Sequence, residues 1–232
     1  MVDKYRKIVL NVPHSSIEGV FERKYSGWSF NSVFINECLI KWTDWHTDFL
    51  FNSNDDRIEM IRFPLSRFIV DVERLTDDPL ESIGQGIIYT KFKEFHRNID
   101  DDTKIVLMNI YNNHINTIKQ ALSEDSILID CHSFPSELSN IDICIGYNND
   151  WSKPTDETID MIVSIFQSIG YKVGINTPYS NSLAPQVEFC YKSIMIEVNK
   201  KTYLKEGNIL DYTGCCTLLK PSINKVYSKL LK

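Results

Sequence analysis

The sequence predicts an α/β protein, a three-layer α/β/α sandwich around a mixed, mostly parallel central sheet. Short runs rich in β-branched residues alternate with longer segments whose apolar residues recur at helical spacing. Parallel strands need long crossover connections, which helices usually supply. The predicted strands are Lys7–Val12, Ile58–Phe63, Arg67–Val72, Ser126–Cys131, Ile141–Tyr147, Tyr171–Ile175 and Ser193–Asn199. The predicted helices are Ser32–Asn52, Lys104–Leu122, Asp156–Ser168 and Thr217–Leu231, and Gly170 closes the third.

Length and composition indicate one ordered domain that spans residues 1–232. The chain is 43% hydrophobic and 24% charged, which is typical of a folded domain with a sizeable core. Its formal net charge of -6 lacks the positive excess that phosphate backbones require. We therefore expect no nucleic-acid partner.

Cysteine usage and apolar patterning predict a cytoplasmic protein. The six cysteines form no Cys-x-x-Cys pair, which favours reduced and mostly buried thiols. No apolar run approaches the roughly 20 residues that span a bilayer, and the N-terminus has no signal-peptide pattern. We expect neither a membrane span nor a membrane partner.

Two segments with little periodicity, Leu75–Thr90 and Asn176–Gln186, are predicted to be long loops, where binding residues often lie. In open α/β sheets, ligands also gather beyond the carboxyl ends of the strands. Residues at strand ends are therefore the first candidates for a functional site.

Two histidines follow predicted strands directly. His14 follows the first strand, and His132 follows the strand that ends at Cys131. A single histidine in such a place is more often a hydrogen-bonded structural residue, but two in equivalent contexts favour a metal site. Asp130 precedes His132 by two residues, so on an extended chain both side chains project to one face. Its carboxylate is therefore placed to orient an imidazole.

A catalytic zinc ion usually takes three protein ligands, and the third ligand has several candidates here. Glu18, Asp44 and Asp48 are all available. On a continuous helix Asp44 and Asp48 would share a face, whereas His46 would lie about 200° around from Asp44. The helix would thus present either the carboxylates or His46 to a site, and acidic residues on a helix are usually a solvated face.

These motifs together resemble the N-formylglutamate amidohydrolase family, whose members share the fold of the zinc carboxypeptidases. The motifs occur in the family's order, and the resemblance extends from residue 12 to Tyr203. The matching pieces are Val12-Pro13-His14-Ser15, Thr43-Asp44-Trp45-His46-Thr47-Asp48, Ser66-Arg67-Phe68-Ile69-Val70-Asp71 with Arg74, Asp130-Cys131-His132-Ser133 and Ile196-Glu197-Val198-Asn199.

The resemblance implies a zinc-dependent amidohydrolase with one Zn²⁺ per chain. His14, Asp44 and His132 would bind the metal, with Glu18 as the alternative carboxylate. Glu197 ends an otherwise apolar strand, and a buried carboxylate needs a partner such as a metal or an arginine. By resemblance, Glu197 would be the general base that activates water.

Four residues of the later motifs are candidates for binding the substrate. Arg67 and Arg74 suit a substrate carboxylate or a developing oxyanion, although one of them could instead pair with Asp71. Ser133 and Asn199 are further substrate-binding candidates. His114 falls on an apolar helical stripe, which favours a core histidine, although the family carries a histidine on this helix.

The expected substrate is a small N-acyl amino acid, such as N-formylglutamate, or a short peptide. Ser16, Glu73 and the Ser180-Asn181-Ser182 turn depart from residues common in the family, which leaves the acyl group and the amino acid open. The alternatives are a carboxypeptidase-like metallopeptidase, another deacylase, or a catalytically silent binding module on the same fold. The sequence does not fix the oligomeric state.

Overall fold

The computed structural model describes residues 1–22, 24–29, 31–205, 211 and 217–232. These residues form two compact units, each built from separated stretches of the chain. The sheet unit comprises Met1–Val12, His46–Ile61 and Ile118–Lys232, and the hairpin unit comprises Pro13–Trp45 and Arg62–Thr117. The expectation of a single domain stays a prediction.

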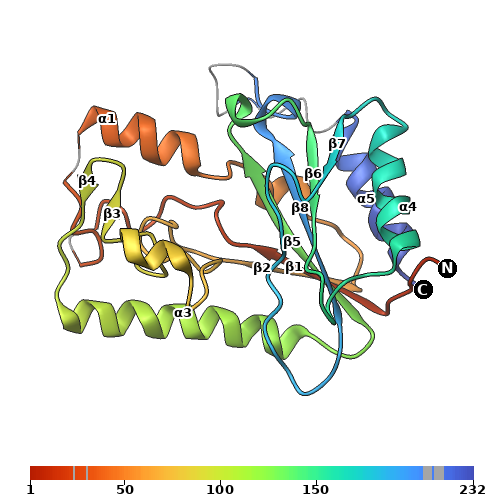
Figure 1. Ribbon diagram of the computed structural model, residues 1–232, viewed down its shortest axis with the longest axis horizontal. Helices are drawn as coiled ribbons and strands as arrows, with labels where there is room; N and C mark the ends of the chain where they lie inside the picture. Colours follow the sequence, from red (N-terminus) through yellow and green to blue (C-terminus); the bar gives the residue numbers. More distant parts are fainter. Residues whose placement is uncertain (23, 30, 206–210, 212–216) are drawn as a thin grey trace. The chain divides into compact units, whose positions relative to one another are not determined.

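A six-stranded sheet forms the centre of the sheet unit (Figure 1). Its order is β2-β1-β5-β8-β6-β7. Neighbours β1, β5 and β8 are parallel, β6 is antiparallel to β8, and β7 is parallel to β6. The strands are β1 (Lys7–Val12), β2 (Ile58–Arg62), β5 (Ser126–Phe134), β6 (Ile143–Gly146), β7 (Val173–Ile175) and β8 (Lys192–Asn199). This mixed, mostly parallel sheet with flanking helices confirms the predicted fold class.

The two faces of the central strands differ in chemistry, because successive side chains of a strand point to opposite faces. One face is apolar and packs on α2 (Thr47–Phe51), α4 (Asp156–Gln167) and α5 (Leu219–Leu230), of which α4 and α5 lie side by side in Figure 1. Its central side chains are Ile127, Ile129, Cys131, Ile194, Ile196 and Val198. The opposite face therefore carries the polar residues of the same strands, Asp130, His132 and Glu197.

The hairpin unit is organised around aromatic side chains. Strands β3 (Lys91–Phe92) and β4 (Phe95–His96) pair in antiparallel fashion. The ring of Phe68 meets those of Phe34 and Phe92 edge to face, at centroid distances of 5.7 and 5.1 Å. Such contacts add stability beyond the burial of apolar area. The remaining helices are α1 (Ser32–Phe34), which continues as a π-helix over Ile35–Ile40, and α3 (Asp101–Ala121), which runs from this unit into the sheet unit.

A buried arginine holds the loops of the hairpin unit together through backbone carbonyls. The Arg97 guanidinium donates to the carbonyl oxygens of Ser26, Ile69 and Tyr89 at 2.6, 2.9 and 3.3 Å. Burial lowers the pKa of Arg97 to about 10. Because Ile69 and Tyr89 flank the ion pairs described below, this cation fixes the backbone on which those pairs depend.

The prediction of a strand over Arg67–Val72 was wrong, because this segment is a loop. The amides of Ile69 and Val70 donate to the carbonyl oxygen of Ser66 in a turn, and the amide of Asp71 donates to the carbonyl oxygen of Ile87. The β-branched side chains are fully buried, but they fill the core of the hairpin unit from a loop. Burial, which the residue types indicated, did not require strand pairing here.

The single helix predicted for Ser32–Asn52 was also wrong, because the chain breaks between the π-helix and α2. The amide of Thr43 still bonds back to Leu39, but the amide of Asp44 donates to the carbonyl oxygen of His14 at 2.9 Å. His46 then adopts a left-handed backbone with φ 59°. Asp44 therefore lies in the break, and the helical geometry used to compare it with Asp48 does not apply.

Smaller differences concern element ends. Strand β5 extends past the predicted end at Cys131 to Phe134, so His132 lies within the strand instead of after it. The loop Leu75–Thr90 contains a short 3-10 helix, Pro79–Ile83, whereas the described backbone of Asn176–Gln186 has no regular element, as predicted.

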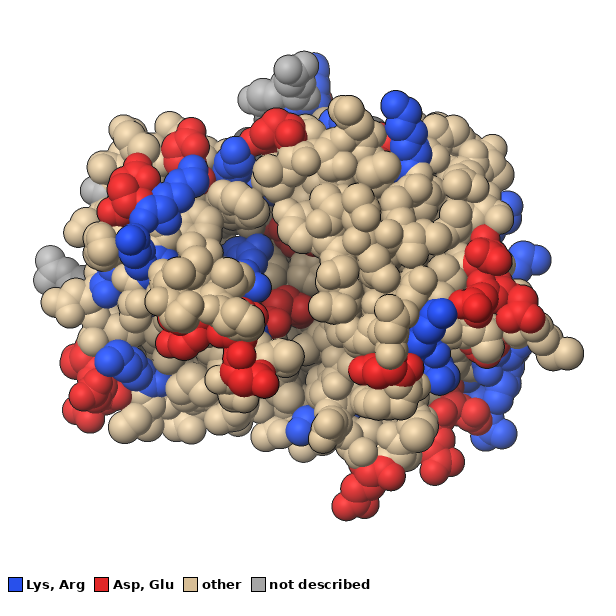
Figure 2. Space-filling view, in the orientation of Figure 1, with Lys and Arg blue, Asp and Glu red and all other residues tan. Residues whose placement is uncertain are grey.

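Charged side chains, helix hydrophobicity and cysteines are described for the part of the chain that the structure covers. Acidic and basic side chains are interspersed on the face shown in Figure 2. No helix among the described residues is long and apolar enough to cross a membrane. Cys38, Cys131 and Cys144 are free and buried, and Cys190 is free and exposed. Residues Cys215 and Cys216 lie outside the described part.

The N-terminal segment is tied to the start of α4 by Asp3, which predicts an acid-sensitive contribution to stability. The Asp3 carboxylate accepts from the Thr155 amide at 2.9 Å and from the hydroxyls of Thr155 and Thr158. Burial opposes this by raising the pKa of Asp3, but these hydrogen bonds outweigh it and leave the pKa below its ordinary value of 3.8. The stabilisation is therefore present above pH 3.8 and lost as the pH falls through the lower folded-state pKa.

We expect Asp3→Ala to lower the free energy of unfolding at neutral pH by about 1–2 kcal/mol. Urea titrations between neutral and acidic pH measure the difference from wild type, which should narrow below pH 3.8. The matched control is Asp160→Ala, on the exposed face of α4. A difference that persists unchanged in acid would contradict this role of the Asp3 charge.

Candidate functional site

In the hairpin unit, the His14 ring lies between two buried carboxylates. Its Nε2 is 2.8 Å from Oδ1 of Asp71, and its Nδ1 is 3.8 Å from Oδ2 of Asp44. All three residues are at most 2% exposed. An ionised carboxylate only accepts hydrogen bonds, so the bond to Asp71 places the proton on Nε2. When the ring is neutral, its lone pair then lies on Nδ1, the side that faces Asp44.

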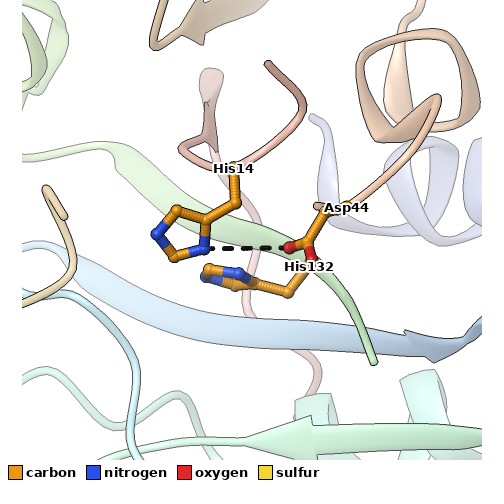
Figure 3. Close-up of side chains that lie close together, drawn as sticks. All are labelled: His14, Asp44 and His132. Atoms are coloured by element: carbon orange, nitrogen blue, oxygen red, sulfur yellow. Dashed lines mark ion pairs between the residues drawn. The ribbon is translucent and has the colours of Figure 1, made fainter. Parts of the chain in front are cut away.

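Local backbone geometry brings Asp44 to His14. Pro13 and His14 leave β1 at its carboxyl end, and the carbonyl oxygen of His14 accepts the amide of Asp44. The helical break at Thr43–His46 frees that amide from the helix and turns the Asp44 side chain toward the ring. Figure 3 draws the resulting ion pair.

Asp71 is the centre of the charge network in the hairpin unit. Its Oδ2 accepts from Arg67 Nη2 at 2.9 Å and from the Tyr89 hydroxyl at 2.6 Å, and its Oδ1 accepts from His14. Burial alone would raise the pKa of Asp71, but the Arg67, His14 and Arg74 side chains hold that pKa well below its ordinary value. Asp71 is therefore an anion at all moderate pH values.

Both arginines singled out in the sequence pair with Asp71. Arg67 makes the direct hydrogen bond, and Arg74 Nε lies 3.5 Å from the same oxygen. Burial lowers the pKa of Arg67, but the surrounding Tyr89, Asp71 and Asp44 raise it well above its ordinary value. Arg74 is the more exposed of the two, with 23% of its side chain accessible against 17% for Arg67. It is thus the better placed to meet a ligand.

In the sheet unit, His132 and Glu197 are register partners on adjacent parallel strands. Their side chains therefore project from the same face of the sheet, with backbones roughly 5 Å apart. Both are buried, at 5% and 8% exposure. The sheet thus places an imidazole and a carboxylate side by side near the carboxyl ends of β5 and β8.

Asp130 contacts His132 as the sequence spacing indicated. Its Oδ1 lies 3.2 Å from His132 Nε2, and the residue is 1% exposed. The Asp130 contact, like that of Asp71 with His14, uses the Nε2 side of the ring. Both histidines therefore contact a buried aspartate through Nε2, and on His14 the other nitrogen, Nδ1, faces Asp44.

The remaining candidates differ in their surroundings. Ser133 Oγ accepts the Tyr203 hydroxyl at 2.9 Å. The Asn199 side chain is fully buried, and its amide group donates to the carbonyl oxygens of Ser139 and Ile141 at 3.1 and 3.0 Å. Asn199 therefore fixes the backbone that follows β5. Glu18 is exposed, in contrast to the buried Asp44.

His114 is 7% exposed and packs edge to face against Phe63 at a centroid distance of 5.0 Å, in the surroundings of a core histidine. Tyr89 and Asn11 were not among the candidates from the sequence, but each holds a buried aspartate. The only signal for Asn11 is an amide in an otherwise apolar strand.

The donor types of the candidate ligands fit a zinc ion. His14 and His132 supply imidazole nitrogens and Asp44 supplies a carboxylate oxygen, the mixture found in catalytic zinc sites. Each imidazole is held from its far side by an aspartate, as metal-binding histidines generally are.

Comparisons with known proteins identify a family for the chain. A family model described as N-formylglutamate amidohydrolase matches residues 6–204. The structure is similar to that of an N-formylglutamate amidohydrolase from Ralstonia eutropha JMP134, with a TM-score of 0.77, 18% identity, and coverage of 97% of this chain and 92% of that chain. It is also similar to gene product Atu2144 from Agrobacterium tumefaciens, with a TM-score of 0.64, 14% identity and the same coverage. At these identities the structural likeness concerns the fold. No curated protein sequence matches the chain.

The Asp71 network predicts a large loss of stability on removal of its charge. In Asp71→Asn, the largely buried Arg67 loses the fully buried anion that it pairs with, so we expect the free energy of unfolding to fall by about 3–5 kcal/mol. Chemical denaturation measures this loss. Asp78→Asn is the matched control, because Asp78 lies 3.6 Å from Arg74 Nη1 at a more exposed position, and it should cost less than about 1 kcal/mol. Equal stabilities of the two variants would contradict the central role of Asp71.

Proposed function

Because this chain belongs to the N-formylglutamate amidohydrolase family, which consists of hydrolases, we propose that it cleaves the amide bond of an N-acyl amino acid, such as N-formylglutamate, with one bound divalent metal ion. The family match over residues 6–204 confirms the resemblance seen in the sequence. The observation that carries the proposal is the buried pair of His132 and Glu197, side by side on one face of the sheet. A proton acceptor beside a metal ligand is what amide hydrolysis by activated water requires.

His14, Asp44 and His132 are the proposed ligands of one Zn²⁺ per chain. Two neutral imidazoles and one carboxylate suit zinc and leave room for water and substrate. When bound, the ion supplies a Lewis acid that polarises the amide carbonyl and acidifies water. The burial of Asp44 favours it over the exposed Glu18 as the third ligand.

Glu197 is the proposed general base. Its carboxylate takes one proton from the attacking water while the water oxygen bonds to the amide carbon. The Arg67 guanidinium is held by Asp71 and is proposed to steady the negative charge that develops on the carbonyl oxygen. Glu197 then returns the proton to the amide nitrogen as the carbon–nitrogen bond breaks. The products are a carboxylic acid and a free amine, and Glu197 ends in its starting state.

Substrate recognition is proposed to use Arg74, the more exposed arginine, for the α-carboxylate of the amino acid. Asn199 would support the binding surface through the backbone that its amide fixes. Ser133 stays a candidate from the sequence alone, because its hydroxyl meets Tyr203 on the face of β5 opposite to His132. The substrate is thus a small molecule. We also propose a cytoplasmic location, which suits the free thiols of Cys38, Cys131 and Cys144.

Replacement of Glu197 by Gln tests the general base. The isosteric amide does not accept the proton, so we expect kcat for N-formylglutamate to fall about 10²–10⁴-fold. Elemental analysis should still find about one zinc per chain, as in wild type. The matched control is Glu124→Gln, at an exposed site next to α3, which should leave both values unchanged. Loss of zinc from Glu197→Gln would make Glu197 a ligand, and unchanged turnover would rule it out as the base.

Replacement of Arg74 by Met tests the carboxylate contact. We expect KM for an N-acyl amino acid to rise about 10-fold or more, because a charge-assisted pair is lost. For the same substrates with the α-carboxylate converted to an amide, KM should be nearly the same in this variant as in wild type. Steady-state kinetics on both substrate series measures the two effects. An equal rise in KM for both substrate series would show that Arg74 does not bind the carboxylate.

A further inference from the structure

A buried asparagine on β1 contacts the aspartate that holds His132. Asn11 is fully buried, and its side-chain amide donates to Oδ1 of Asp130 at 2.9 Å. The two residues are register partners on the parallel strands β1 and β5, so they share a face of the sheet. The neighbouring β1 positions Val9 and Leu10 are apolar and also fully buried. An amide in such surroundings is costly unless it is hydrogen-bonded, and here it is.

The Asp130 carboxylate is constrained on both of its oxygens. Oδ1 accepts from Asn11 and lies 3.2 Å from His132 Nε2, while Oδ2 accepts the backbone amide of Leu183 at 3.1 Å. Leu183 belongs to the long loop Asn176–Gln186. Two fixed donors from different parts of the sheet unit therefore set the plane of the carboxylate before the imidazole meets it.

We propose that Asn11 is a positioning residue, which with the Leu183 amide orients Asp130 so that His132 holds its proton on Nε2 and presents Nδ1 to the metal. An ionised carboxylate has no proton to donate, so the ring nitrogen beside it must be the donor. The other nitrogen then keeps the lone pair that a metal needs. The inference rests on the proposed metal-binding role of His132, but the state of the ring is a property of the metal-free protein.

Asn11 acts through Asp130 and contacts neither the proposed ion nor the reacting atoms. Its loss should allow the carboxylate to rotate, and the ring then populates both tautomers. A ring with its proton on Nδ1 must exchange that proton to bind metal, so the affinity falls. Mutation of a residue that orients a metal ligand without binding the metal typically lowers metal affinity about 10–100-fold.

The test compares metal-free wild type with Asn11→Leu, which keeps the volume and removes the donor. Histidine ¹⁵N chemical shifts, recorded at about pH 8 where a free imidazole is neutral, report which nitrogen carries the proton. The His132 signals are assigned with His132→Gln. We expect a single Nε2–H form in wild type and a mixture in Asn11→Leu. The matched control is Val9→Ala, on the same face of β1, which should keep the wild-type spectrum.

Zinc affinity, measured by competition with a chelator, should fall about 10-fold in Asn11→Leu and stay near wild type in Val9→Ala. If Asn11→Leu does not fold, Asn11→Ser removes the contact with a shorter side chain. An Nδ1–H form in wild type, or an unchanged spectrum in the Asn11 variants, would overturn the proposal. Failure of wild type to bind zinc, with the expected tautomers present, would instead count against the proposed function.

Discussion

The candidate site depends on one repeated interaction, a buried aspartate that holds the Nε2 side of a buried imidazole. Asp71 does this for His14 and Asp130 does it for His132. Each aspartate is in turn fixed by donors, Arg67 and the Tyr89 hydroxyl in one case and the amides of Asn11 and Leu183 in the other. An imidazole held in this way has one orientation and one tautomer, as the proposed metal-binding role requires.

In the sheet unit, the hydrophobic core and the candidate site residues lie on opposite faces of the central sheet. One face of the sheet is packed on α2, α4 and α5 and supplies the hydrophobic core of the sheet unit. The opposite face is then available for Asp130, His132 and Glu197 at the carboxyl ends of parallel strands. In the hairpin unit, Arg97 and the aromatic cluster hold the loops from which His14, Asp44 and Asp71 extend.

The strands of the sheet could be predicted from their short β-branched runs, and three of the helices could be predicted from apolar residues that recur at helical spacing. The charge network could be predicted only in part. Arg67 and Arg74 lie close to Asp71 in sequence, whereas Asn11 and Asp130 meet only when β1 pairs with β5. The break at Asp44 was missed because its cause is tertiary, a hydrogen bond from the Asp44 amide to His14. The buried β-branched residues after Arg67 resembled a strand because burial and strand pairing favour the same residue types.

The central claim is that the two restrained imidazoles serve one ion. X-ray absorption spectroscopy of the zinc-loaded protein tests it directly, because scattering from imidazole rings reports how many histidines bind the metal. We expect two imidazoles in wild type, and one in each of His14→Gln and His132→Gln. Two imidazoles in either variant, or fewer than two in wild type, would contradict it.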